Sequence, residues 1–137
     1  MFNFSKPSAG RIKFMHSATR LYKAVSEKIA SPRATEADLL LEAALQLQKV
    51  QGNWETRGAS ELDDALRYNR MLWTIFISTV TKTDNPLPKA IRQNVANLGI
   101  FVMKHTIAIL AEPKPEKIST LIEINRNLAA GLTASAA

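Results

Sequence analysis

The chain has 137 residues, an ordinary length for a single domain and enough to bury roughly two-thirds of the surface that the unfolded chain exposes. Hydrophobic residues make up 46% of the chain and charged residues 22%, a globular composition that excludes wholesale disorder. The absence of cysteine excludes disulfides, thiolate metal sites and thiol nucleophiles, and the formal net charge of +6 favours an anionic partner.

The first predicted element is a basic amphipathic helix over residues 11–30, which Ser31-Pro32 ends. Residues 1–33 hold seven Lys and Arg residues against Glu27 alone, whereas the rest of the chain holds eleven charges of each sign. All the excess positive charge therefore lies in this segment. The apolar stripe of the helix consists of Phe14, Ala18, Leu21, Val25 and Ile29.

The basic face of this helix has two interpretations. One is contact with RNA or lipid headgroups through a basic patch of Lys13, Arg20 and Lys23. The other, which we favour, is a solvated charged face over a stripe that packs on the core. Tyr22 is the one aromatic residue beside these charges on the middle turns of the helix, so the interleaved stacking platforms of single-strand binders are missing. The segment also lacks the continuous apolar region of a secretory signal, and a cytoplasmic location is expected.

Two further helices are predicted over residues 35–52 and about 60–82. Each begins at a hydroxyl residue, Thr35 or Ser60, with an aspartate three residues later, a capping-box-like start signal. The later helix is apolar nearly all round from Met71 to Ile77. Such a helix is either central to a bundle or lends one face to a partner.

The fourth helix is predicted over residues 88–110, with proline at its first position, and the fifth follows the proline-rich connector 112–115. Gly99 in the middle of the fourth helix costs about 1 kcal/mol relative to alanine, which indicates the close approach of a neighbour. In the fifth helix, Asn125 falls within the apolar stripe, where its amide must find hydrogen-bond partners or cost roughly 1–3 kcal/mol. Gly131 is predicted to be a left-handed cap.

These five segments show no period-2 alternation long enough for a strand. They predict an all-α fold, a compact bundle of about five helices in a single domain of residues 1–137. The longest apolar run, residues 71–80, is about half the length that a bilayer-crossing helix needs, so no membrane insertion is expected.

Groups that could perform catalysis are few. The two histidines, His16 and His105, have no carboxylate three or four residues later, and His105 is expected on the solvent side of its helix. Metal-binding spacings, phosphate-binding glycine loops and glycine-flanked serines are missing from the sequence. The chain is therefore not expected to be an enzyme, and no catalytic residue, metal ligand or cofactor is assigned.

Four short blocks in the second half of the chain occur in a specific order and spacing. They are Asn69-Arg70-Met71-Leu72-Trp73-Thr74, then Asn85-Pro86-Leu87-Pro88, then Leu98-Gly99-Ile100-Phe101-Val102-Met103, then Leu121-Ile122-Glu123-Ile124-Asn125 with Gly131-Leu132. Together these blocks resemble the flagellar biosynthesis regulator family FlaF. The resemblance covers about residues 60–132, while residues 1–30 are more basic than the family leads one to expect.

The resemblance implies a small cytoplasmic helical protein, without enzyme activity, that is needed for flagellin production and filament assembly. Such a protein acts alongside the regulator FlbT. Two roles are open: a chaperone that binds flagellin for export, or a post-transcriptional regulator of flagellin synthesis acting with FlbT through RNA. The extensive apolar surface and the few nucleic-acid features favour the chaperone. A third interpretation is a structural homo-oligomer that uses the apolar face for self-association.

The candidate partner-binding residues lie on the third to fifth helices and the connector between the third and fourth. They are Trp73, Phe76, Leu87, Gly99, Phe101, Ile122 and Asn125. The aromatic positions are equally consistent with core packing and with a groove for a partner helix.

Overall fold

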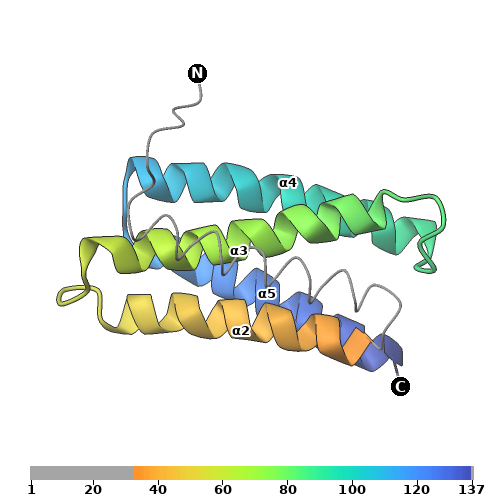
Figure 1. Ribbon diagram of the computed structural model, residues 1–137, viewed down its shortest axis with the longest axis horizontal. Helices are drawn as coiled ribbons and strands as arrows, with labels where there is room; N and C mark the ends of the chain where they lie inside the picture. Colours follow the sequence, from red (N-terminus) through yellow and green to blue (C-terminus); the bar gives the residue numbers. More distant parts are fainter. Residues whose placement is uncertain (1–32, 137) are drawn as a thin grey trace, which may run out of the picture.

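A computed structural model of the chain describes residues 33–136, which form four α-helices and contain no strand (Figure 1). The helices are α2 (Arg33–Gly52), α3 (Ala59–Val80), α4 (Lys89–Ala111) and α5 (Pro115–Ala136). The predicted all-α class is confirmed. The described part holds four helices rather than about five, because the helix predicted over residues 11–30 lies outside it. The predicted basic patch, Lys13, Arg20 and Lys23, also lies outside the described residues.

Successive helices run in opposite directions, so the four helices form an up-and-down bundle (Figure 1). α2 packs against α3 and α5, and its contact with α5 is the most extensive in the bundle. α4 packs mainly on α3 and touches α5 much less. The backbones of α2 and α4 do not approach one another, and neither do those of α3 and α5, so these pairs lie diagonally across the core. α4 is therefore the helix that is packed least extensively against the others.

The core consists of apolar residues at three- and four-residue spacing on the inward side of each helix. Fully burying one such side chain contributes about 1.5–3 kcal/mol, so these rows set how the helices pack. The most deeply buried apolar side chains include Leu40 and Leu47 of α2, Leu66, Leu72 and Trp73 of α3, Val102 and Ile109 of α4, and Ile118 and Leu121 of α5.

The predicted starts of two helices are wrong. α2 begins at Arg33, so Thr35 lies within its first turn and does not precede it. α3 begins at Ala59, and its N-cap is Gly58, which supplies no side-chain hydrogen bond. A hydroxyl can cap only from the position before the first helical residue, and Ser60 lies two residues after that position.

Two other predictions about helix ends differ from the structure. Pro88 is the N-cap of α4 and not its first helical residue. Gly131 does not cap α5, because the helix continues to Ala136 and none of the described glycines has a positive φ. The tail of small residues after Gly131 supports further helix, since alanine has the highest helix propensity.

Candidate functional site

Most of the residues predicted to bind a partner lie inside the bundle. Those that are buried are Trp73, Phe76, Leu87, Gly99, Ile122 and Asn125. Phe101 is the exception, with 46% of its surface exposed. In this packed state a partner can reach only Phe101 among the seven, because neighbouring helices cover the other six.

A buried polar network joins α3, α5 and α2. The indole Nε1 of Trp73 donates a hydrogen bond to Oδ1 of Asn125 at 2.9 Å. The amide of Asn125 donates to Oδ1 of Asn69 at 2.7 Å and to the carbonyl oxygen of Leu40 at 3.4 Å. The expectation that Asn125 must find partners is confirmed. Asn69, which the sequence did not single out, completes the network but leaves its own Nδ2 without a hydrogen bond.

At Gly99, α4 lies close against α3. A Cβ atom at this position would overlap the side chain of Ile77 and would lie 3.5 Å from Cε3 of Trp73. The predicted close neighbour is thus confirmed. The missing side chain lets the two helices pack tightly beside the buried network.

The outward side of α4 is apolar. Ile107 has 66% of its surface exposed, Ile100 51% and Leu110 45%. With the half-buried Ala96 and Met103, these side chains recur at alternating four- and three-residue spacing, so they share one face of the helix. We call the five residues the outer row of α4.

The outer row is visible in the sequence as an apolar repeat, but periodicity alone did not show that it would face solvent. The row is offset by one residue from the buried row of the same helix, so α4 carries two apolar repeats side by side. Ile100 and Phe101 belong to one of the FlaF-like blocks, whereas no motif or spacing singled out Ile107 and Leu110. The buried row is Val95, Gly99, Val102, Thr106 and Ile109.

Phe101 lies outside the outer row, on the side of α4 that faces α5. Its ring stacks on the imidazole of His105, with ring centroids 5.4 Å apart. The Nε2 of His105 lies 2.7 Å from the carbonyl oxygen of Lys117 on α5. His105 is therefore half-buried between the two helices. The expectation that it points freely into solvent is wrong.

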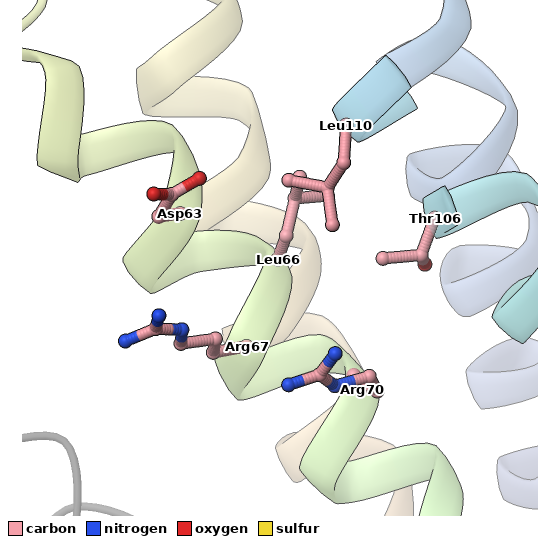
Figure 2. Close-up of a pocket in the computed structure, with 6 residues that line it drawn as sticks. All are labelled: Asp63, Leu66, Arg67, Arg70, Thr106 and Leu110. Atoms are coloured by element: carbon pink, nitrogen blue, oxygen red, sulfur yellow. The ribbon is translucent and has the colours of Figure 1, made fainter. Parts of the chain in front are cut away.

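A pocket of about 170 Å³ lies between α3 and α4, beside one end of the outer row (Figure 2). Leu66 and Leu110 supply apolar walls, and Arg67 and Arg70 extend from the neighbouring turns of α3. The pocket is completed by Asp63 and Thr106. It combines apolar walls with two guanidinium groups against one carboxylate.

Positive charge surrounds the outer row. α4 contains three basic residues and no acidic one. The guanidinium of one of them, Arg92, donates to the carbonyl oxygen of Lys82 at 3.1 Å. Lys89, Lys104 and Arg70 are exposed, and none of them forms an ion pair with another residue of the described part.

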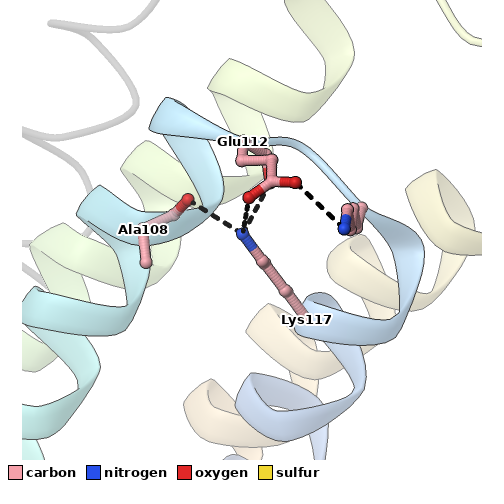
Figure 3. A network of polar contacts seen from close by, with 4 residues as sticks. Ala108, Glu112 and Lys117 are labelled. Atoms are coloured by element: carbon pink, nitrogen blue, oxygen red, sulfur yellow. Dashed lines mark hydrogen bonds and ion pairs between the residues drawn. The ribbon is translucent and has the colours of Figure 1, made fainter.

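The corner between α4 and α5 is held by a polar network (Figure 3). The Nζ of Lys117 donates to the carbonyl oxygens of Glu112 at 2.9 Å and of Ala108 at 3.4 Å, which lie at the end of α4. The carboxylate of Glu112 pairs with Lys114 at 2.9 Å and with Lys117 at 3.5 Å. These two ammonium groups, Lys114 first, lower the pKa of the Glu112 carboxyl.

α4 is also long and apolar enough, by length and composition alone, to cross a membrane, and 28% of its most apolar stretch is buried in the bundle. Helices of soluble proteins meet the same criteria, so a single such helix is weak evidence for a membrane span. Within residues 33–136, no three His, Asp or Glu side chains come together in a way that could hold a metal ion.

A sequence model described as flagellar protein FlaF matches residues 18–132. The match begins well before the blocks noted in the sequence and takes in part of the predicted helix over residues 11–30. Comparison with curated proteins and with solved structures gave no match.

Proposed function

Because the chain belongs to the FlaF family of flagellar proteins, we propose that it binds flagellin in the cytoplasm and keeps it soluble and competent for export. The observation that carries the proposal is the apolar outer row of α4, where Ile100, Ile107 and Leu110 are exposed together. The proposed role involves no reaction and no cofactor. It places this chain upstream of filament assembly.

Large exposed apolar side chains are costly to keep beside water when they are contiguous. Single exposed leucines are common on soluble proteins, but a continuous apolar patch marks an interaction surface. The outer row runs for several turns along one face and includes Met103, whose flexible thioether adapts to partners of different shape. An amphipathic helix of flagellin could cover it by helix-in-groove packing.

The test is complex formation between the full chain and purified monomeric flagellin, followed by sedimentation and titration calorimetry. A double variant, Ile100→Ser with Ile107→Ser, should weaken binding at least about tenfold, as loss of central apolar contacts does. The matched control is Leu41→Ser with Leu45→Ser on α2, whose side chains are 45% and 46% exposed. Absence of a complex with the unaltered chain would refute the proposal.

A second candidate function rests on the charge of residues 1–33, which carry the whole net positive charge. In this version the protein regulates flagellin synthesis with FlbT, through contact with the flagellin messenger. Binding to the messenger leader RNA should then fall steeply with salt, because phosphate contacts release counterions. It should also fall when Lys13, Arg20 and Lys23 are replaced by glutamine. RNA binding that is absent at low salt would remove this candidate.

A further inference from the structure

We propose that the outer row of α4 receives an amphipathic helix that carries acidic side chains along both flanks of its apolar stripe. The identification of that helix as a segment of flagellin rests on the proposed function. The chemistry of the helix, in contrast, is argued from the described residues themselves.

The outer row has the length and form of a helix-binding strip. From Ala96 to Leu110 it covers about 21 Å along the helix axis, at about 1.5 Å per residue. A partner helix of about 20 residues would cover it completely. Alternating three- and four-residue spacing is the pattern by which one helix receives the side chains of another.

The pocket at the end of the outer row supplies a defined position for one large side chain. Its volume of about 170 Å³ is similar to that of apolar cavities, about 150 Å³, that hold a benzene ring. Leu66 and Leu110 would contact the apolar part of such a side chain (Figure 2). The pocket therefore has room for one large partner side chain whose apolar part contacts these two leucines.

The charges on either side of the outer row determine which kind of amphipathic helix fits. Arg70 borders the row on the α3 side, and Lys104 lies between Ile100 and Ile107 along its opposite edge. Lys89 continues the row toward the start of α4. Asp63 lines the same pocket, but it forms no ion pair with the exposed Arg70, whose charge is therefore available to a partner. Acidic side chains on the partner would meet cations on both edges.

The same charges disfavour the other occupants. A second copy of the chain would bring the basic α4 face against itself and place like charges together. Residues 1–33 of the same chain, with seven basic residues against one acidic residue, would also meet the row with like charge. An anionic membrane would satisfy the charges, but a flat lipid surface does not use the pocket between α3 and α4.

The experiment compares two synthetic helical peptides of about 20 residues that share one leucine stripe and carry either glutamate or lysine on both flanks. Binding to the full chain is measured by calorimetry at low and at moderate salt. The glutamate peptide should bind at least about tenfold more tightly at low salt, and added salt should reduce the difference. Equal affinities for the two peptides would overturn the proposal.

Charge reversal on the protein locates the site. The double variant Arg70→Glu with Lys104→Glu should invert the preference, so that the lysine peptide binds more tightly than the glutamate peptide. Arg126→Glu, at an exposed position on α5, is the matched control and should leave both affinities unchanged. A thermal melt of each variant checks that the bundle is intact. An effect of the control as large as that of the double variant would count against the site.

Further measurements separate this proposal from the proposed function and from the other occupants. If flagellin binds and loses affinity with the outer-row serine variants but not with the double charge reversal, the proposed function stands and the acidic-helix proposal fails. If the glutamate peptide binds this face and flagellin does not, the acidic-helix proposal stands and the proposed function fails. Binding to phosphatidylglycerol vesicles without peptide binding, or a dimer in sedimentation that the serine variants dissociate, would overturn the acidic-helix proposal.

Discussion

Asn125 joins three helices through one side chain. Because the backbones of α3 and α5 do not touch, the hydrogen bonds from Trp73 to Asn125 and from Asn125 to Asn69 link these helices directly across that diagonal of the core. All three side chains are fully buried. A buried donor or acceptor that loses its partner costs about 1–3 kcal/mol, so the network selects the one helix arrangement in which its members meet.

A double-mutant cycle tests this link. Trp73→Phe removes the donor to Asn125, and Asn125→Leu removes the acceptor of Trp73; each should lower the free energy of unfolding by about 2–4 kcal/mol, from an unpaired polar group and altered packing. The double variant should be less destabilised than the sum, because neither partner is then left alone. Urea unfolding of the four proteins measures the coupling, and simple additivity would contradict a direct interaction.

Gly99 and Gly131 differ in the space around them. Both lie within helices, but a Cβ atom at Gly99 would overlap Ile77, whereas nothing lies within 4 Å of the corresponding position at Gly131. We expect Gly131→Ala to raise the free energy of unfolding by a few tenths to about 1 kcal/mol, from helix propensity. Gly99→Ala should lower it by about 1–3 kcal/mol, from overpacking. Thermal melts that shift in the same direction for both would refute this explanation.

At the scale of elements, the packing of α2 against α3 should make the stability of the protein depend on alkaline pH through Tyr68. Burial, and to a lesser extent the charge of Glu42, raise the pKa of the Tyr68 phenol. As the pH rises past about 10, the unfolded chain ionises first. Stability should therefore fall between the unfolded and folded pKa values. Tyr68→Phe should reduce this alkaline loss, measured by urea unfolding near pH 8 and above pH 10; an unchanged loss would exclude Tyr68 as its source.

The corner between α4 and α5 makes a prediction about helix capping. Lys117→Met removes a cation that donates to two carbonyl oxygens at the end of α4, and should cost about 0.5–1 kcal/mol. The matched control is Lys114→Met, whose ammonium pairs only with the exposed carboxylate of Glu112 and should cost little. Equal losses in thermal melts would show that the carbonyl contacts contribute nothing.

Acid should weaken the ion pairs of Glu112 at the same corner. Because the pKa of Glu112 is lowered in the folded state, its ion pairs stabilise above the unfolded pKa, near 4.3, and this contribution is lost as the pH falls through the folded pKa. The bonds from Lys117 to the carbonyl oxygens do not depend on that carboxylate.

At the scale of the whole molecule, the bundle is unevenly packed. α4 contacts chiefly α3, whereas α2 has extensive neighbours on two sides. We expect backbone amides of α4 to exchange with deuterium faster than those of α2, because local opening is easier where fewer apolar contacts must be broken. Hydrogen–deuterium exchange with mass spectrometry measures this, and α4 protection equal to that of α2 would contradict it.

The helices were predictable because periodicity and proline positions are local signals. The four described helices lie where the apolar repeats placed them, and Gly99 and Asn125 were recognised as positions that need a neighbour. The helix starts were less predictable, since Gly58 caps α3 without a side chain while Ser60 offered a more conventional signal. Local sequence favoured the wrong residue there, because the cap of α3 lies two residues before Ser60.

The candidate site was much less predictable. An apolar stretch such as residues 71–77 does not reveal which side faces the core, because that depends on helices distant in the sequence. Trp73, for example, faces the core, where its indole bonds to Asn125, 52 residues away in the sequence. The outer row of α4 is as apolar as the buried row beside it, so sequence periodicity could not determine which of the two would face solvent.

That ambiguity gives Gly99 a consequence beyond stability. α4 has two apolar rows, and a rotation of about 100° about its own axis, the angle between successive residues, would turn Ile107 inward and the buried row outward. The notch at Gly99 accommodates Ile77 in one orientation only. The absence of a side chain at Gly99 thus fixes the orientation of α4 about its own axis. It thereby determines which apolar row is exposed to a binding partner.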